Sequence, residues 1–174
     1  MRKKNPVFAV IVLLLIAGAM LFPRSSAHVD GAAYFPFDQM DSNCVVTVIR
    51  EDLSVSQFVD EEHQTQRSEY ALETSVKEEL FDFLQTSSYR THRDVNLYWL
   101  IPGVKQVVSV SSTDPVSYRI ILTSPDGEEL LHILTTGDDY LSIDGEWIRI
   151  QDPNWGARLE EILAKAQLVQ TYFA

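Results

Sequence analysis

The stretch that decides the fold is residues 117–150, "SYRIILTSPDGEELLHILTTGDDYLSIDGEWIRI". Four short runs within it alternate apolar and polar residues, and they are separated by "SPDG", "GDD" and "DG". Proline fixes its own backbone angle and glycine accepts a positive one, so these separators are typical of tight turns. The last of them, Asp144-Gly145, is the two-residue signal of a β-hairpin. The stretch therefore predicts an antiparallel meander of four strands.

A further strand and two helices are predicted around this meander. Residues 44–51, "CVVTVIRE", are β-branched and apolar on both faces, as in a strand inside a sheet. Residues 74–87 and 152–169 repeat apolar side chains at helical spacing, with charged residues between them. The polar segment before the first helix is ambiguous: part of it can pair as a strand, and residues 59–66, "VDEEHQTQ", are typical of an exposed loop.

The helix ends carry their own signals. Ser75 and Glu78 have the spacing of a capping box, in which each side chain satisfies a free amide of the first turn. Asp152 followed by Pro153 is a common way to begin a helix. The last residues, 170–174, are expected to fray.

These elements predict an α+β domain. We expect a single, mostly antiparallel β-sheet with the two amphipathic helices packed on one face, preceded by a hydrophobic signal or anchor helix. The chain divides into residues 1–27, the signal peptide or membrane anchor, and residues 28–43, a linker whose end tucks onto the domain. Residues 44–174 form a single domain, and this length is enough to bury a core.

The amino terminus has the three parts of an export signal. Basic residues 2–4 precede an unbroken apolar run, residues 7–22, and Ser25 and Ala27 supply the small residues of a signal-peptidase site. A retained anchor is the alternative, although the run gives roughly 24 Å of helix against a hydrocarbon core of roughly 30 Å. Cleavage after Ala27 is favoured, and either outcome leaves the rest of the chain outside the cytoplasm, secreted or tethered.

Charge narrows the class of partner. Residues 1–27 hold four of the 14 basic residues and no acidic ones, so residues 28–174 carry 10 Lys and Arg against 25 Asp and Glu, a net charge of −15. This argues against nucleic acid and anionic lipid as ligands. Membrane contact is expected only through an uncleaved amino terminus, and the partner is expected to be an envelope protein or polymer.

No residue pattern points to catalysis, so we expect no enzyme activity, no cofactor and no metal site. The sequence has no GxSxG, HExxH, GxxxxGK[ST] or CxxC motif, and its four histidines are scattered. Asp152, Asn154 and Gly156 are faintly similar to a calcium loop, but the later glycine and glutamate of an EF-hand are missing and helix capping accounts for Asp152. Cys44, the only cysteine, lies on a predicted strand and is expected to be buried rather than reactive.

Four residues are weak candidates for contact with a ligand: Trp99, Trp147, Asp144 and Glu146. The tryptophans offer rings for stacking, and both acids flank a predicted turn. An ordinary explanation competes with this one, because large rings usually pack in a core and turn residues are often polar. The alternative function that uses these residues is a small cell-envelope hydrolase or carbohydrate-binding module, with Trp155 extending the stacking platform.

The order of elements resembles that of small exported domains of unknown function from Firmicutes, many of them lipoproteins. The resemblance rests on the helix "VKEELFDFLQ", the strands "SYRIILTSPDGEELLHI" and "YLSIDGEWIRI", and the closing helix "LEEILAKA". It spans residues 44–167, and the lipoprotein cysteine of that group is absent here. The resemblance implies a compartment and a fold but no site. We therefore expect a non-enzymatic, extracytoplasmic, envelope-associated binding domain of unknown ligand.

Overall fold

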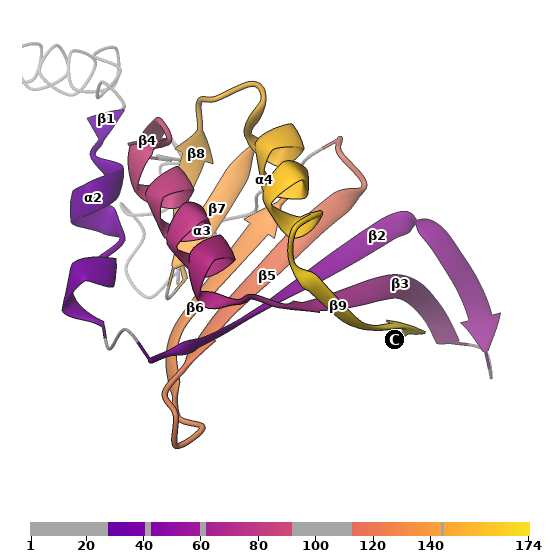
Figure 1. The fold of residues 1–174 in the computed structure, drawn as a ribbon. Coiled ribbons are helices and arrows are strands. Elements are labelled where there is room, and N and C mark those ends of the chain that lie inside the picture. The colour runs from indigo at the N-terminus through magenta and orange to yellow at the C-terminus, as the bar shows by residue number, and fades with distance from the viewer. Residues whose placement is uncertain (1–27, 41–42, 60–61, 92–112, 144) are drawn as a thin grey trace, which may run out of the picture.

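A single antiparallel β-sheet forms the centre of the computed structural model, which describes residues 28–40, 43–59, 62–91, 113–143 and 145–174. Within these ranges the sheet has nine strands in the order β1-β4-β8-β7-β6-β5-β2-β3-β9 (Figure 1). The predicted α+β class with one antiparallel sheet is confirmed.

The elements have the following bounds. The strands are β1 (His28–Val29), β2 (Val45–Val59), β3 (Glu62–Ala71), β4 (Tyr89–Thr91), β5 (Val116–Thr123), β6 (Glu129–Thr136), β7 (Tyr140–Ile143), β8 (Glu146–Ile150) and β9 (Gln167–Phe173). The helices are α2 (Gly31–Tyr34), α3 (Thr74–Thr86) and α4 (Trp155–Leu163), with a 3₁₀ turn η1 (Phe37–Gln39).

Strands β5 to β8 pair in sequence order and form the predicted meander. Gly127 (φ 88°) and Gly145 (φ 84°) take left-handed backbone angles in its first and last turns. Residues with a β-carbon rarely adopt such angles, which explains the glycine in each turn. The amide of Gly127 donates to the carbonyl of Ser124 at 3.0 Å and closes the first turn.

The other end of the sheet is an arm made of β9, β3 and the second half of β2, residues 53–59 (Figure 1). Residues 62–66, expected to lie in a loop, belong to β3 and pair with β2. Residues 170–173, expected to fray, belong to β9 and pair with β3. Both predictions were wrong because the arm is exposed on much of its surface, so its strands lack the apolar alternation that marks a buried face.

Helix α4 is shorter than predicted at both ends. It stops at Leu163, where the amides of Lys165 and Ala166 donate to the carbonyls of Ile162 and Leu163 at 3.0 Å each, and the chain then extends into β9. Val169 falls on the helical spacing but lies in β9. A short apolar run fits either period, and the edge of β3 offers it backbone partners that an isolated helix end lacks.

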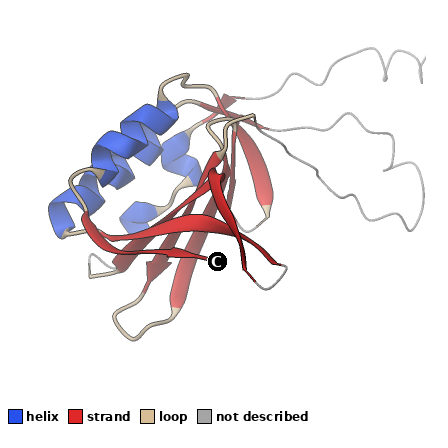
Figure 2. Ribbon diagram, turned by 90° about the vertical axis from the view of Figure 1, so that its right-hand side faces the viewer, coloured by secondary structure: helices blue, strands red, loops and turns tan. Residues whose placement is uncertain are grey.

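Helices α3 and α4 cover one face of the sheet (Figure 2). Every second strand residue is buried beneath them: Val46 and Val48 of β2, Tyr118, Ile120 and Leu122 of β5, Leu131 and Ile133 of β6, Leu141 of β7, and Ile148 and Ile150 of β8. Leu80 and Leu84 of α3 and Leu159 and Leu163 of α4 complete the core. Cys44 is buried, as expected.

The predicted helix caps are not formed. Helix α3 begins after Glu73 without a side-chain cap, so Ser75 and Glu78 make no capping box. Helix α4 begins at Trp155, and Asp152 instead accepts the amide of Asn154 at 2.9 Å in the turn that precedes the helix.

Residues 28–40 pack against the domain. A β-carbon on Gly31 would meet the backbone of Leu84 and Gln85, so α2 lies in close contact with the end of α3. Phe35 and Phe37 follow and are both buried. Their rings stack with 5.6 Å between centroids. The segment therefore contributes aromatic rings to the core.

None of the helices in the described ranges has the length and apolar character needed to span a bilayer. The expected signal or anchor, residues 1–27, lies outside the described residues, together with Ser25 and Ala27.

Candidate functional site

The face of the sheet opposite the helices, here called the helix-free face, carries the second set of alternating strand residues. Two rows of side chains cross it, because residues paired on neighbouring strands point to the same side. The first row contains Tyr172, Arg67, Glu51 and Ser117, and beyond β6 it continues through Tyr140, Arg149 and Arg90. The second contains Gln170, Glu69, Ile49, Arg119, Leu134, Ser142 and Trp147.

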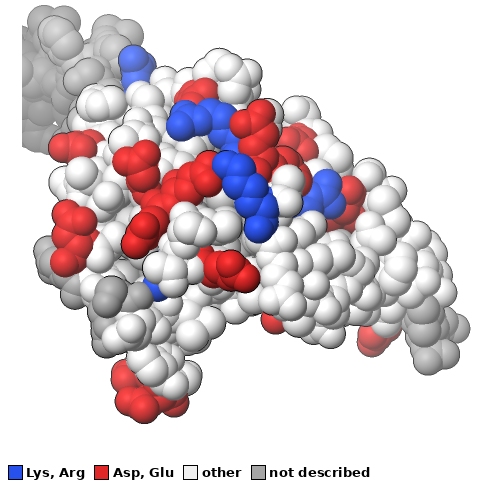
Figure 3. Space-filling model, viewed as in Figure 1, with Lys and Arg blue, Asp and Glu red and all other residues white. Residues whose placement is uncertain are grey.

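These rows are basic in a chain that is acidic elsewhere. Their charged members are Arg67, Arg90, Arg119, Arg149, Glu51 and Glu69. The six sum to +2 (4 − 2), whereas residues 28–174 sum to −15. Figure 3 shows the opposite, helix-bearing side, where acidic residues predominate over the body of the domain. These two rows therefore differ from the helix-bearing side in the sign of the charge that they present.

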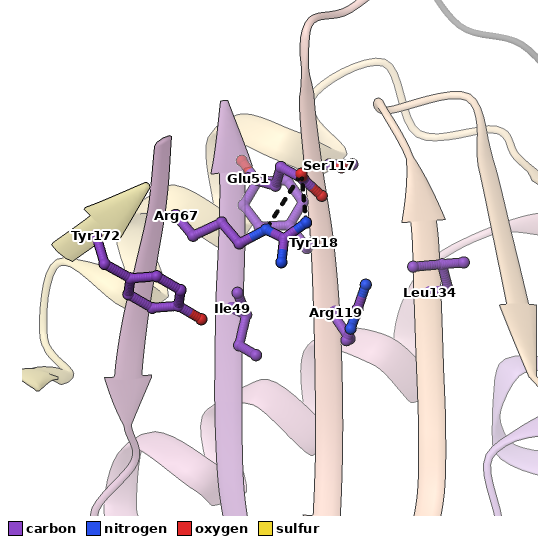
Figure 4. Close-up of a pocket in the computed structure, with 8 residues that line it drawn as sticks. All are labelled: Ile49, Glu51, Arg67, Ser117, Tyr118, Arg119, Leu134 and Tyr172. Carbon is purple, nitrogen blue, oxygen red and sulfur yellow. Dashed lines mark hydrogen bonds and ion pairs between the residues drawn. The ribbon is translucent and has the colours of Figure 1, made fainter. Parts of the chain in front are cut away.

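A hollow of about 60 Å³ lies where the two rows cross β3, β2 and β5 (Figure 4). Its lining residues are Ile49, Glu51, Arg67, Ser117, Tyr118, Arg119, Leu134 and Tyr172. They come from five strands, and the pairing of those strands alone brings them together. The hollow has room for one small group and not for an enclosed substrate, because pockets that hold small molecules usually measure about 300–1,000 Å³.

An ion pair forms one wall of the hollow. Arg67 donates to Glu51 at 3.0 Å through Nη2 and at 3.2 Å through Nε, and the hydroxyl of Thr65 donates to the same carboxylate oxygen at 2.5 Å. Burial by itself would raise the pKa of Glu51. The hydrogen bonds from Thr65 and Arg67, with the positive fields of Arg67 and Arg119, outweigh burial and hold this pKa below its ordinary value. Glu51 is therefore ionised at neutral pH.

Arg119 forms the opposite wall. It stands on β5 beside the Glu51–Arg67 pair (Figure 4), and its guanidinium makes no hydrogen bond or ion pair with the part of the chain that the structure describes. A guanidinium presents a planar fork of donors that matches the two oxygens of a carboxylate or phosphate. The hollow can therefore bind one oxyanion.

A second charged cluster lies on the helix side and has a different character. Arg50 of β2 pairs with Asp52 at 3.2 Å and with Glu160 of α4 at 2.7 Å. The hydroxyl of Tyr118 donates to the same oxygen of Glu160 at 2.7 Å. Burial, and then the hydrogen bond and charge of Glu160, raise the pKa of Tyr118 far above its ordinary value. These charges satisfy one another, so the cluster fastens α4 to the sheet.

The four weak candidates for ligand contact do not form one site among the described residues. Trp147 is half-buried on the helix-free face. Glu146, the preceding residue, points to the other side, and its carbonyl accepts the hydroxyl of Tyr34 at 3.0 Å. Trp99 and Asp144 lie outside the described residues. Trp155 is fully buried in the core, so it cannot extend a stacking surface on the opposite side of the sheet.

Arg67, Arg119 and Arg149 were not singled out from the sequence, although part of the signal was there. Arg119 and Arg149 alternate with residues that are buried beneath the helices, which places both arginines on the helix-free face. Their neighbours depend on register between strands far apart in the sequence, and alternation does not determine register. In the described ranges no three histidine, cysteine, aspartate or glutamate side chains gather in a way that could hold a metal ion.

Comparison with protein-family models, with curated proteins and with solved structures finds no match to this chain. The resemblance to exported Firmicutes domains therefore stays an expectation.

Proposed function

We propose that this chain is a non-enzymatic binding domain that acts outside the cytoplasm, at the cell envelope. In this proposal residues 1–27 form the signal or anchor helix, and the domain is secreted or tethered by it. The ligand is an anionic envelope polymer, bound along the two rows of the helix-free face. The observation that carries the proposal is the guanidinium of Arg119, which stands unpaired by described residues in a hollow sized for one oxyanion.

The size of the hollow supports binding over turnover. Its one carboxylate, Glu51, is held ionised by Arg67 and Thr65 and so has no proton to donate. A glycoside hydrolase needs two carboxyl groups at one cleft, one of them with a raised pKa. Asp138 does have a raised pKa, caused by burial and then by the nearby charge of Asp114. It lies on the helix side of the sheet, against Gly156 of α4, and gives no support to a hydrolase at the hollow.

The shape of the basic surface supports a polymer. The first row runs from Arg67 on β3 to Arg90 on β4, across six strand spacings, or roughly 29 Å at about 4.8 Å each. A chain with repeated anionic groups can contact several arginines along this distance, and the single hollow takes one group. The net charge of −15 repels such a ligand from the rest of the domain, which restricts binding to this face.

Binding of two probes by the full chain in detergent micelles tests the proposal. Polyphosphate and poly-L-glutamate distinguish phosphate from carboxylate ligands, and neutral dextran is the blank. Arg119→Gln should weaken binding of the preferred probe by about tenfold, equivalent to about 1.4 kcal/mol. The affinity of Arg119→Lys should lie between those of the parent and Arg119→Gln, because lysine keeps the positive charge and lacks the planar fork of donors.

Arg158→Gln is the matched control, since Arg158 is exposed on α4 and lies on the other side of the sheet. Its affinity should stay within twofold of the parent, by the weak effect of distant surface charges at moderate salt. Equal losses for Arg119 and Arg158 variants, or no binding of either probe at low salt, would count against the proposed site. Turnover of an envelope substrate that is lost on changing one acid would count against a non-enzymatic role.

A further inference from the structure

The outer edge of β9 carries backbone hydrogen-bonding groups that pair with no strand in the described ranges. Thr65 and Ala174 exchange two backbone hydrogen bonds, at 3.0 and 3.1 Å. Residue pairs in an antiparallel ladder alternate between bonded and non-bonded, so Tyr172 also directs its amide and carbonyl toward β3. Thr171 and Phe173 direct theirs outward, and no strand in the described ranges pairs with that side of β9.

This edge lacks the features that usually protect an open strand edge from pairing with another chain. Folded proteins commonly place charge or proline on an open edge strand, because unpaired backbone invites another strand. β9 reads "QLVQTYF" and contains neither. Leu168 and Val169 are each 54% exposed, and Phe58 of β2, on the same arm, is 76% exposed. On the helix-bearing side, which Figure 3 shows, the arm carries few lysine, arginine, aspartate or glutamate side chains.

The end of the chain is also symmetric in character about Thr171. Apolar residues stand two and three positions from it on both sides, Leu168 and Val169 before it and Phe173 and Ala174 after it. Its direct neighbours, Gln170 and Tyr172, each carry a side-chain hydrogen-bonding group. We infer that β9 pairs antiparallel with β9 of a second copy of this chain, about a twofold axis through Thr171. Thr171 then faces its own equivalent, with its outward backbone groups forming the central pair of hydrogen bonds.

Side-chain pairing agrees with this register. Phe173 lies opposite Val169 of the partner subunit, an aromatic and a β-branched residue, which is a favourable cross-strand pair. Val169 has no Cα partner on β3, since the ladder is irregular there.

Charge also favours this part of the surface. Each copy carries −15 over residues 28–174, so two copies repel one another over most of their surfaces. β9 brings no charge to the contact. Added salt screens the remaining repulsion, and pairing should therefore strengthen as ionic strength rises. A contact held by ion pairs would respond in the opposite direction.

The pair would form one continuous sheet of 18 strands (9 + 9). The twofold axis is perpendicular to the sheet, so both helix-free faces lie on the same side. Arg67 is one strand in from β9, and the two copies of Arg67 are then separated by three strand spacings, roughly 14 Å, across the sheet and by two residues, roughly 7 Å, along it. A polymer could engage both hollows at once, with a gain in avidity. That gain rests on the proposed function, whereas the pairing itself does not.

Disulfide trapping of the full chain in detergent micelles tests the register. Thr171→Cys should form a disulfide-linked dimer under mild oxidation, because bonded antiparallel pairs have Cα atoms about 5.5 Å apart, within disulfide range. Cys44 is buried and does not interfere. Val169→Cys is the matched control: its two copies lie four residues apart along the strand, roughly 14 Å, which is too far to link.

A mixture of Val169→Cys and Phe173→Cys should form a disulfide-linked dimer, because these two positions lie opposite each other in the proposed register. Failure of Thr171→Cys to link, or equal linking of Val169→Cys alone, overturns the register. Light scattering on charged variants gives an independent test. Thr171→Lys and Thr171→Glu should each be monomeric, and their equimolar mixture should recover twice the mass of one chain; dimers of either variant alone overturn the pairing.

The pairing and the proposed ligand can fail separately. A chain that binds polyphosphate or poly-L-glutamate through Arg119 but stays monomeric at about 500 mM salt, where repulsion is largely screened, overturns the pairing alone. A chain that is dimeric by light scattering but binds neither probe overturns the proposed function alone.

Discussion

The carboxylate of Asp138, on the turn between β6 and β7, lies directly against Gly156 in the first turn of α4. A β-carbon at residue 156 would overlap both carboxylate oxygens. No side chain at the N-cap position satisfies the amides of this helix end. Asp138 therefore brings a carboxylate from the meander to the amino-terminal end of α4, where the N-cap residue supplies no side-chain hydrogen bond.

Gly156→Ala should destabilise the protein by about 1–3 kcal/mol, the usual cost of forcing extra volume into a packed contact. Glycine to alanine inside a helix normally stabilises by about 1 kcal/mol, so the sign of the effect is diagnostic. Chemical denaturation measures it. Asp138→Ala added to Gly156→Ala should recover part of the loss, and strictly additive effects would show that the two residues do not clash.

Asp138→Asn should make the protein more stable at pH 7 and leave it unchanged near pH 3. Burial, followed by the nearby charge of Asp114, raises the pKa of Asp138 in the folded state. The contribution of its protonated form is fully present below the unfolded pKa and is lost as pH rises through the folded pKa. Asparagine keeps an acceptor for Gly156 and cannot ionise.

Thermal unfolding across this pH range measures the effect of Asp138→Asn. Asp126→Asn, the same substitution at an exposed turn, is the control. A variant less stable than the parent at pH 7 would contradict the assignment.

Glu51→Gln should change the stability at pH 7 in the direction opposite to that of Asp138→Asn. The pKa of Glu51 is depressed in the folded state, so its contribution is present above the unfolded pKa and is lost as pH falls through the folded value. The variant should be less stable at pH 7 by about 1 kcal/mol or less, as for a partly exposed ion pair. The difference should vanish near pH 3.

Glu69→Gln is the matched control for Glu51→Gln. Glu69 lies on the same face and is hydrogen-bonded to Gln170, with no ion pair in the described residues. Its replacement should change the pH dependence much less. Equal effects of the two substitutions would show that the Arg67 contact does not stabilise the fold.

The sequence predicted best where structure is local. The meander follows from Pro125, Gly127 and Gly145, whose backbone preferences act within a few residues, and from the alternation of the strands between them. The apolar stripes of α3 and α4 are likewise local, and both helices are present. The start of α4 was mispredicted because the group that meets this helix end is Asp138 of the meander, and sequence proximity does not reveal that contact.

The arm and the hollow depend on contacts between distant segments. β9 forms a strand because it pairs with the edge of β3. The sequence of β3 is itself so polar that part of it is predicted to be a loop. Arg119 and Arg67 lie on either side of β2, so their proximity depends on the register of β2 with β3 and on the register of β2 with β5. The turn residues of the sequence specify neither register. Alternation assigns a residue to a face of the sheet, and it does not choose its neighbours on that face.

The two ends of the described sheet are unequal, and this limits how far assembly through strand edges can go. Among the described residues β1 pairs with β4 over His28 and Val29, while β9 presents seven residues. A subunit with two long adhesive edges would add copies at both and grow into a fibre. A subunit with one such edge has no open edge left once that edge has paired with a second copy. In the described part of the sheet, the short β1 therefore favours a closed pair over an open filament.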